Sequence, residues 1–219
     1  MTISEENYIK VIYHLSLVTT SGVNTNAIAG MLNAKASSVT EMLKKLSEKE
    51  LLIYQKYQGV NLTKSGLLTA KMIVRKHRLW EVFLVEKLEF TWDEVHEIAE
   101  ELEHIQSLKL INKLDAFLGF PPFDPHGDPI PNEKGEITKL DKLLLSEAIP
   151  NQTYQCVGVK DTTATFLQYL DNQNISLGTS IIVLKKEDFD LSLTIKLLDQ
   201  TITISNKIAE NVFIKIKKK

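Results

Sequence analysis

A proline- and glycine-rich segment, GFPPFDPHGDPIP at residues 119–131, divides this chain into two parts of different character. Proline lacks the N–H that a helix needs and disfavours helical geometry in the residue before it, so a helix must end here. Before the segment, apolar residues recur mainly at helical spacing. From about Leu144, short alternating and β-branched runs dominate. The chain is therefore predicted to be α+β, with a mainly helical front and a small β-barrel of about five strands at the rear.

The front part shows three helical stretches followed by a strand pair. The first covers residues 4–17, with Ser4 as the expected N-cap, and the second covers about residues 25–32. A third helix begins at Ser37. The β-branched and aromatic run at residues 51–63, with a glycine at its bend, predicts a β-hairpin.

This order of elements is typical of a winged helix-turn-helix, whose third helix lies in the major groove of DNA. Small hydroxyl side chains allow close approach to base edges, and lysines attract phosphates. The candidate DNA-binding residues lie around the start of the third helix, one turn further along it and at the hairpin tip: Lys35, Ala36, Ser37, Ser38, Thr40, Glu41, Lys44, Lys45, Lys56, Tyr57 and Gln58. Such a module can instead serve protein contacts, and the element order is the stronger argument for DNA.

Charge is distributed unevenly along the chain. Residues 1–78 hold 11 Lys/Arg and 5 Asp/Glu, which leaves 15 and 23 of the totals of 26 and 28 for the remainder. A basic front and an acidic rear suggest that the front meets a polyanion and the rear holds cations, although ordinary surface charge gives the same counts.

Targeting signals and a disulfide framework are not evident. The chain has no run of eighteen apolar residues, and its first residues do not resemble a secretory signal. Cys156 is the only cysteine. We therefore expect no membrane partner and a reducing, cytoplasmic setting.

The most unusual stretch is WDEVHEIAEELEH, residues 92–104, which holds six carboxylates and two histidines. Thr91 and Glu94 have the spacing of a capping box, so a helix is predicted to start there and run toward Leu118. An acidic helix of this kind is often no more than a solvated face.

Helical geometry gathers the candidate ligands of this stretch. At about 100° per residue, four of them share an arc beside an apolar stripe, so they border a buried seam. They are His96, Glu100, Glu103 and His104. Neighbouring buried carboxylates are costly unless a cation neutralises them.

The preceding helix repeats the pattern, because His77 and Glu81 lie four residues apart. One such pair is usually a surface hydrogen bond, but two pairs together with Glu-x-x-Glu-His favour metal binding. Oxygen-rich ligands with one or two imidazoles and no thiolate favour Mn²⁺ or Fe²⁺, with Zn²⁺ and Co²⁺ as further candidates.

The motifs NYIKVIYHL, RKHRLWEVFL, VHEIAEELEHIQS and DPHGDPIP, in this order, resemble the diphtheria-toxin-repressor family, specifically its manganese transport regulator branch. The resemblance covers nearly the whole chain. It implies a winged helix-turn-helix at residues 1–72, a helical dimerisation and metal-binding domain at 73–140, and an SH3-like domain at 144–219. Members use a divalent metal as co-repressor and bind palindromic operators in double-stranded DNA as homodimers.

The resemblance implies a primary metal site on four residues, with His77 nearby: Asn7, Glu100, Glu103 and His104. The family usually has Asp or Met at the place of Asn7, which brings no charge, so a purely structural Asn7 is an alternative. Iron-responsive members carry Cys where this chain has Glu100, and the harder oxygen ligand favours Mn²⁺.

A second site is also implied, and its composition is left open. It comprises either His77, Glu81 and His96, or Glu81 with Asp124, His126 and Asp161. Asp124 also suits an Asx turn before Pro125. Some manganese members have a bridging glutamate where this chain has Lys10, which favours two separate sites over a bridged pair of ions.

One ion joining the first helix to the metal-binding helix would fix the recognition helices of a homodimer about 34 Å apart. The later apolar stripe forms either the dimer surface or internal core: Leu108, Ile111, Leu114 and Phe117. A di-metal oxidase needs Glu-x-x-His on two helices, which this chain lacks, and an interaction adaptor is the third class considered. The sequence thus predicts a repressor of metal-uptake genes that responds to Mn²⁺ or alternatively to Fe²⁺. We do not expect the protein to be an enzyme.

Overall fold

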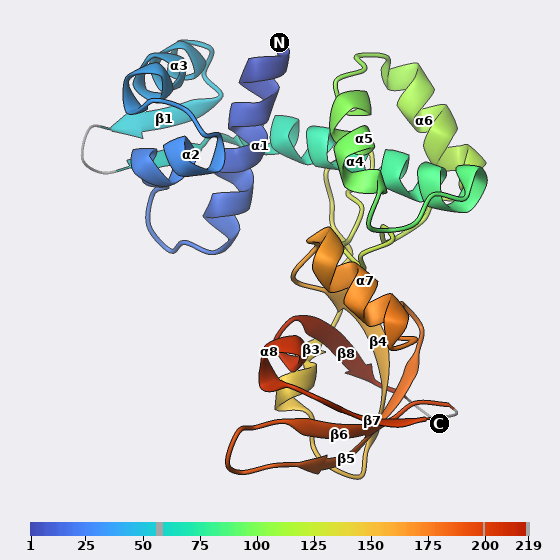
Figure 1. Ribbon diagram of the computed structural model, residues 1–219. Coiled ribbons are helices and arrows are strands. Elements are labelled where there is room, and N and C mark those ends of the chain that lie inside the picture. Colours follow the sequence, from blue (N-terminus) through green and yellow to red (C-terminus); the bar gives the residue numbers. More distant parts are fainter. Residues whose placement is uncertain (56–58, 199, 218–219) are drawn as a thin grey trace.

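The computed structural model describes residues 1–55, 59–198 and 200–217. Figure 1 shows three consecutive units: an N-terminal group of helices with a hairpin, a helical middle, and a C-terminal sheet with short helices. The α+β class and the three-part architecture expected from the sequence are confirmed. Among the described residues, no helix combines the length and apolar character that crossing a membrane requires.

The N-terminal unit has the predicted order of three helices and a strand pair. Its elements are α1 (Ile3–Leu17), α2 (Thr25–Met31), α3 (Ala36–Glu48), β1 (Leu52–Gln55) and β2 (Gly59–Leu62). The strands pair antiparallel, which confirms the hairpin. The expected N-cap Ser4 is wrong: Thr2 caps α1, because its hydroxyl accepts from the Glu5 N–H at 3.3 Å while the Glu5 carboxylate accepts from the Thr2 N–H at 3.1 Å.

A buried apolar core joins the three helices to the hairpin, with Ile9, Ile28, Leu43 and Val60 completely inaccessible to solvent. The turn glycine is required by geometry. Gly59 has a φ of 86°, and a Cβ there would lie 2.7 Å from the carbonyl carbon of a neighbouring backbone. The hairpin is thereby held close to the helices as a wing.

The middle unit contains α4 (Lys64–Leu88), α5 (Val95–Leu102) and α6 (Leu108–Phe117). The prediction of one helix from Thr91 toward Leu118 is therefore wrong. Glu94 does accept from the Thr91 N–H and hydroxyl, at 3.0 and 2.7 Å, but this contact closes a turn before α5. Ser107 interrupts the helix because its hydroxyl caps α6, accepting from the Leu110 N–H.

The apolar stripe of α6 is divided between two environments. Ile111 and Leu114 are buried in the core of the middle unit, whereas Leu108 and Phe117 are about two-thirds exposed. The internal-core expectation is thus confirmed for Ile111 and Leu114, and the dimer surface stays a prediction for the exposed Leu108 and Phe117. A buried ion pair, Arg75 to Asp115 at 2.8 Å, fastens α4 to α6.

The C-terminal unit is an antiparallel sheet with the strand order β3-β8-β4-β5-β6-β7. The strands are β3 (Leu143–Leu144), β4 (Thr153–Val159), β5 (Ser180–Lys186), β6 (Leu193–Lys196), β7 (Thr201–Ile204) and β8 (Val212–Ile216), accompanied by η1 (Leu145–Glu147), α7 (Ala164–Asn172) and α8 (Asn206–Ala209). About five strands were expected, and the described residues form six. Cys156 is buried in this core, and burial raises the pKa of its thiol to about 11.

Within the part of the chain that the structure describes, three hydrogen bonds attach the C-terminal unit to the middle unit. The Trp92 indole donates to Asp171 on α7 at 2.9 Å, and the Gln168 amide donates to Asp93 at 2.7 Å. The N–H of Val159 on β4 donates to the carbonyl of His126 at 2.9 Å. The last bond places a strand of the sheet directly behind the loop that carries two candidate metal ligands.

Candidate metal centre and nucleic-acid interface

The structure brings Glu81, Asp124 and His126 together in a buried group, called here the Glu81 cluster. One ligand atom from each side chain lies within 4.8 Å of the others. Glu81 comes from α4, and the other two come from the proline-rich segment. All three side chains are nearly inaccessible to solvent.

The loop of this cluster folds as an Asx-type turn, the alternative considered for Asp124. Its Oδ1 accepts from the backbone N–H of His126 at 2.8 Å and of Asp128 at 2.9 Å. The other oxygen, Oδ2, lies 3.3 Å from Nε of Arg78. The turn therefore fixes the Asp124 carboxylate at the site, so the two interpretations of this residue are compatible.

The ionisable groups of the cluster shift one another's pKa. Burial, together with the nearby charge of Glu81, raises the pKa of Asp124 to about 7, although the charge of Arg78 opposes this shift. Burial alone would lower the pKa of His126, but the hydrogen bond and charge of Glu81 raise it to about 9. Two carboxylate oxygens and an imidazole nitrogen are ligands that suit a divalent cation.

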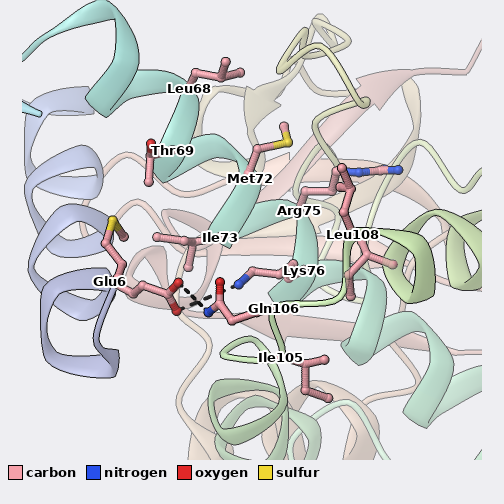
Figure 2. A pocket seen from close by; sticks show the side chains of 12 residues that line it. Glu6, Leu68, Thr69, Met72, Ile73, Arg75, Lys76, Ile105, Gln106 and Leu108 are labelled. Atoms are coloured by element: carbon pink, nitrogen blue, oxygen red, sulfur yellow. Dashed lines mark hydrogen bonds and ion pairs between the residues drawn. The ribbon is translucent and has the colours of Figure 1, made fainter.

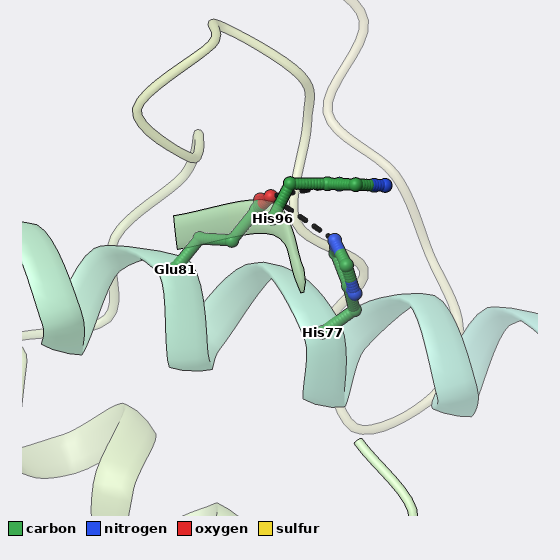
Figure 3. Close-up of side chains that lie close together, drawn as sticks. All are labelled: His77, Glu81 and His96. Carbon is green, nitrogen blue, oxygen red and sulfur yellow. Dashed lines mark hydrogen bonds and ion pairs between the residues drawn. The ribbon is translucent and has the colours of Figure 1, made fainter. Parts of the chain in front are cut away.

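Glu81 also belongs to a second group, with His77 and His96 (Figure 3). Its Oε1 lies 3.0 Å from Nε2 of His77 and 3.5 Å from Nδ1 of His96. Burial opposes ionisation of Glu81, but hydrogen bonds from the surrounding imidazoles hold its pKa well below its usual range. The imidazole of His96 is half exposed, so this group opens toward solvent. His77, Glu81 and His96 of the one expected composition, and Glu81, Asp124 and His126 of the other, are therefore gathered around the same carboxylate, without Asp161.

The residues of the expected primary site contact other charged side chains and do not converge on one point: Glu103 and Glu100 contact Lys10, and His104 contacts Glu6. The buried Glu103 carboxylate contacts His77 Nδ1 at 2.7 Å and Lys10 Nζ at 2.7 and 2.9 Å. Burial would raise the pKa of Glu103, but the His77 hydrogen bond and the Lys10 charge lower it. Glu100 is half exposed and lies 3.2 Å from the same Lys10 ammonium.

His104 is paired with a residue that the sequence did not single out. Its Nδ1 lies 2.6 Å from Oε2 of Glu6. Figure 2 shows the other contact of this carboxylate, in which the Gln106 amide donates to Oε1 at 2.8 Å. Glu6 is buried, whereas Asn7, the expected ligand, is only half-buried. Adjacent residues of a helix point in directions about 100° apart, so Glu6 and Asn7 cannot both face His104. The available signal was the charge of Glu6, which Asn7 lacks.

Asp161 lies three residues before α7, and its Oδ1 accepts from the Thr163 N–H at 2.9 Å. Its neighbours Lys160 and Thr162 line a cavity of about 200 Å³ together with residues of the Glu81 cluster. The structure therefore brings this segment to the centre, while the role of Asp161 as a ligand stays a prediction.

The expected DNA-reading face of α3 is largely open to solvent. Its exposed residues are Lys35, Ala36, Ser37, Ser38, Glu41, Lys44 and Lys45. Thr40 is half-buried and its hydroxyl donates to the Ala36 carbonyl, while Val39 and Leu43 on the opposite face enter the core. Lys45 also lies 2.9 Å from Glu5 on α1. The hairpin residues Lys56, Tyr57 and Gln58 lie outside the described residues.

An exposed helix of this kind, joined through α1 to a buried carboxylate–imidazole centre, defines a metal-dependent transcriptional regulator. Comparisons with family models agree. Residues 1–60 match the DNA-binding domain of the iron-dependent repressors, residues 63–132 match their metal-binding and dimerisation domain, and residues 143–216 match a FeoA domain.

Individual proteins give the same picture. An uncharacterised HTH-type transcriptional regulator of Methanocaldococcus jannaschii is 36% identical over 118 residues, which are 54% of this chain and 94% of that protein. The HTH-type transcriptional regulator MntR of Listeria monocytogenes is 36% identical over 140 residues, 63% of this chain and 95% of that protein. A solved manganese-dependent transcriptional repressor in complex with manganese has a TM-score of 0.85 and 32% identity, covering 97% of this chain and 100% of that one.

The chain therefore belongs to the diphtheria-toxin-repressor-like family, in its manganese transport regulator branch. This finding confirms the family predicted from the motifs. It makes the protein a metal-dependent transcriptional repressor of that type and not an enzyme.

Proposed function

We propose that this protein is a Mn²⁺-dependent repressor that acts in the cytoplasm as a homodimer on palindromic operators and controls genes for metal uptake. The observation that carries the proposal is the Glu81 cluster, in which oxygens of two buried carboxylates and an imidazole nitrogen lie within 4.8 Å of one another. Ligand atoms of these kinds, gathered this closely and buried, suit a divalent cation. The cluster lies where the helical middle meets both of the other units.

The ligand chemistry supports Mn²⁺ as the co-repressor. Glu81, Asp124 and His126 would hold one ion, with His77 and His96 adjoining it. Carboxylate oxygens predominate, and the single thiol of the chain is buried in the C-terminal core, so the softer metals gain no sulfur ligand. Fe²⁺ is the alternative, because its ligand preferences are similar. The manganese-bound structure with 32% identity supports the same choice.

The primary site would form at the junction of α1 with the segment that follows α5. Glu100, Glu103 and His104 lie on one side of it, and Glu6 or Asn7 on the other. When bound, the ion supplies positive charge there. The chain's own residues would position the DNA-reading helix α3. Because α1 packs with α3 in one core, a constraint on α1 also constrains α3.

A homodimer requires an exposed apolar surface on the middle unit. Leu108, Leu110 and Phe117 of α6 and the adjacent Phe120 are all exposed. Exposed apolar side chains that a second molecule covers are typical of association sites, and we propose that these residues contribute to one. Covering this surface with a second copy would place two α3 helices on one DNA molecule, where half-sites separated by about 34 Å are required.

The proposal is tested by measuring DNA affinity as a function of metal. Fluorescence anisotropy with operator DNA selected from a randomised pool should show binding at least tenfold tighter with Mn²⁺ than in a chelator. Asp124→Asn should reduce this metal response. Ser38→Glu is the matched control, since it should weaken DNA binding through charge repulsion and leave metal binding unchanged. Equal DNA affinity with Mn²⁺ and after exhaustive chelation would overturn the proposal.

A further inference from the structure

Lys10 occupies a position at the α1–α5 junction where its charge is fully engaged. Its Nζ lies 2.7 and 2.9 Å from the two carboxylate oxygens of Glu103 and 3.2 Å from Oε1 of Glu100. The Lys10 side chain is 12% exposed and that of Glu103 only 1%. A lysine ammonium has three N–H donors, and these three oxygens can satisfy all of them.

The contact joins two parts of the molecule that are distant in sequence. Lys10 is on α1, which packs in the same core as α3, while Glu100 and Glu103 belong to the end of α5. Lys76, a second lysine near this junction, lies 3.8 Å from Glu6 instead. Lys10 therefore links the N-terminal unit directly to two of the expected metal ligands.

We propose that Lys10 is a tethered cation that holds α1 against α5 in the metal-free protein and competes with the incoming ion for Glu103 and Glu100. This inference rests on the proposed function, because it assumes that an ion uses these carboxylates. A buried carboxylate that loses its cation must gain another, so the ion and the ammonium exclude one another at Glu103.

Lys10 should therefore raise operator affinity in the absence of metal and lower the affinity for metal. The ammonium preserves part of the α1–α5 contact without metal, so the protein in a chelator keeps some affinity for its operator. The same contact must be broken before the ion binds, so it reduces metal affinity and raises the metal concentration needed for repression. A lysine that only stabilised the fold would not produce this opposition.

The test compares wild type with Lys10→Met, which keeps the aliphatic length and removes the charge. Calorimetric titration with Mn²⁺ should show about tenfold tighter binding at the junction site in the variant, a change of about 1.4 kcal/mol. Operator affinity in a chelator should instead fall, by about tenfold, measured by fluorescence anisotropy. Lys10→Arg keeps a cation and should retain the chelated affinity.

Lys186→Met is the matched control. Lys186 is a half-buried lysine whose ammonium donates to the Ser146 carbonyl at 2.7 Å in the C-terminal unit, far from the DNA-reading helix in the fold. Its loss should change neither measurement. Lys10→Met with unchanged or weaker Mn²⁺ binding would overturn the tethered-cation inference. Wild-type protein that fails to bind Mn²⁺ or DNA at all would instead overturn the proposed function.

A second measurement covers the case in which Lys10→Met does not fold, as judged by circular dichroism. A crystal structure of the wild-type protein with Mn²⁺ should show Nζ of Lys10 moved away from Glu103. Persistence of that ion pair while Glu103 coordinates the ion would refute the competition.

Discussion

The Glu81 cluster and the junction group, which we define as Lys10, Glu103, Glu6 and His104, use the same kinds of side chain and are organised differently. In the Glu81 cluster, a long helix and a hydrogen-bonded turn bring three candidate ligands within 4.8 Å of one another. In the junction group, each carboxylate is paired with a lysine or an imidazole from another element. Candidate ligands on one unit are thus already gathered, whereas candidate ligands divided between units contact separate partners.

The strongest test of this contrast is Glu81→Gln, which keeps the shape and removes the shared charge. Because Glu81 serves both groups of possible ligands, we expect Mn²⁺ affinity at the cluster to fall by about 100-fold, measured by calorimetry. Glu100→Gln is the control, since Glu100 belongs to the expected junction site and lies outside the Glu81 cluster, so a loss of Mn²⁺ affinity at the cluster below about threefold is expected. Similar losses in the two variants would remove the distinction between the two regions.

The next largest effect concerns His14, which lies on α1 in the wall of the cavity beside the cluster. Burial, with the charges of Arg78 and Lys10, lowers the pKa of His14 from 6.5 to about 4. A depressed histidine pKa means that the unfolded chain binds the proton first. Stability is therefore complete above pH 6.5 and is lost as the pH falls toward 4.

In urea unfolding of metal-free protein, wild type should lose about 2 kcal/mol more than His14→Gln between about pH 7.5 and 5. The difference between the two proteins isolates His14, because the other titrating groups are common to both. Parallel pH profiles would show that the cavity wall does not penalise a charged imidazole.

The smallest effect distinguishes two neighbours on α1. Glu6 faces His104 and Asn7 is half-buried beside it, so Glu6→Gln should weaken Mn²⁺ binding at the junction by about tenfold. Asn7→Ala should change it less than about twofold, within the scatter expected for a residue outside the site. The opposite ranking would show that metal binding rotates α1 and brings Asn7 to the ion.

The sequence predicts the features that depend on local periodicity. The order of helices and hairpin in the reading unit follows from apolar spacing and a turn glycine, and His77 and Glu81 are placed on one face by the helical repeat. The break between α5 and α6 is harder to predict, because the apolar pattern continues across it. Only the side-chain cap of Ser107 marks it.

The pairings at the junction could not be predicted for a different reason. Which of Glu6 and Asn7 faces His104 depends on the rotation of α1 about its axis, and this rotation is set by packing against the other helices. The engagement of Lys10 with Glu103 likewise joins residues 93 positions apart. Local patterns carry no information about such contacts.

The turn that carries Asp124 and His126 packs closely against strand β4 of the C-terminal unit. Gly127 has a φ of 83°, and a Cβ there would lie 2.1 Å from the carbonyl oxygen of Val157 on β4. The barrel therefore serves as a template for the turn, although the three ligands of the cluster lie outside it. If the cluster holds the ion, the distances between its ligands depend on a seam between two domains. We therefore expect substitutions in β4 that touch no ligand to change the relative affinities for ions of different radius.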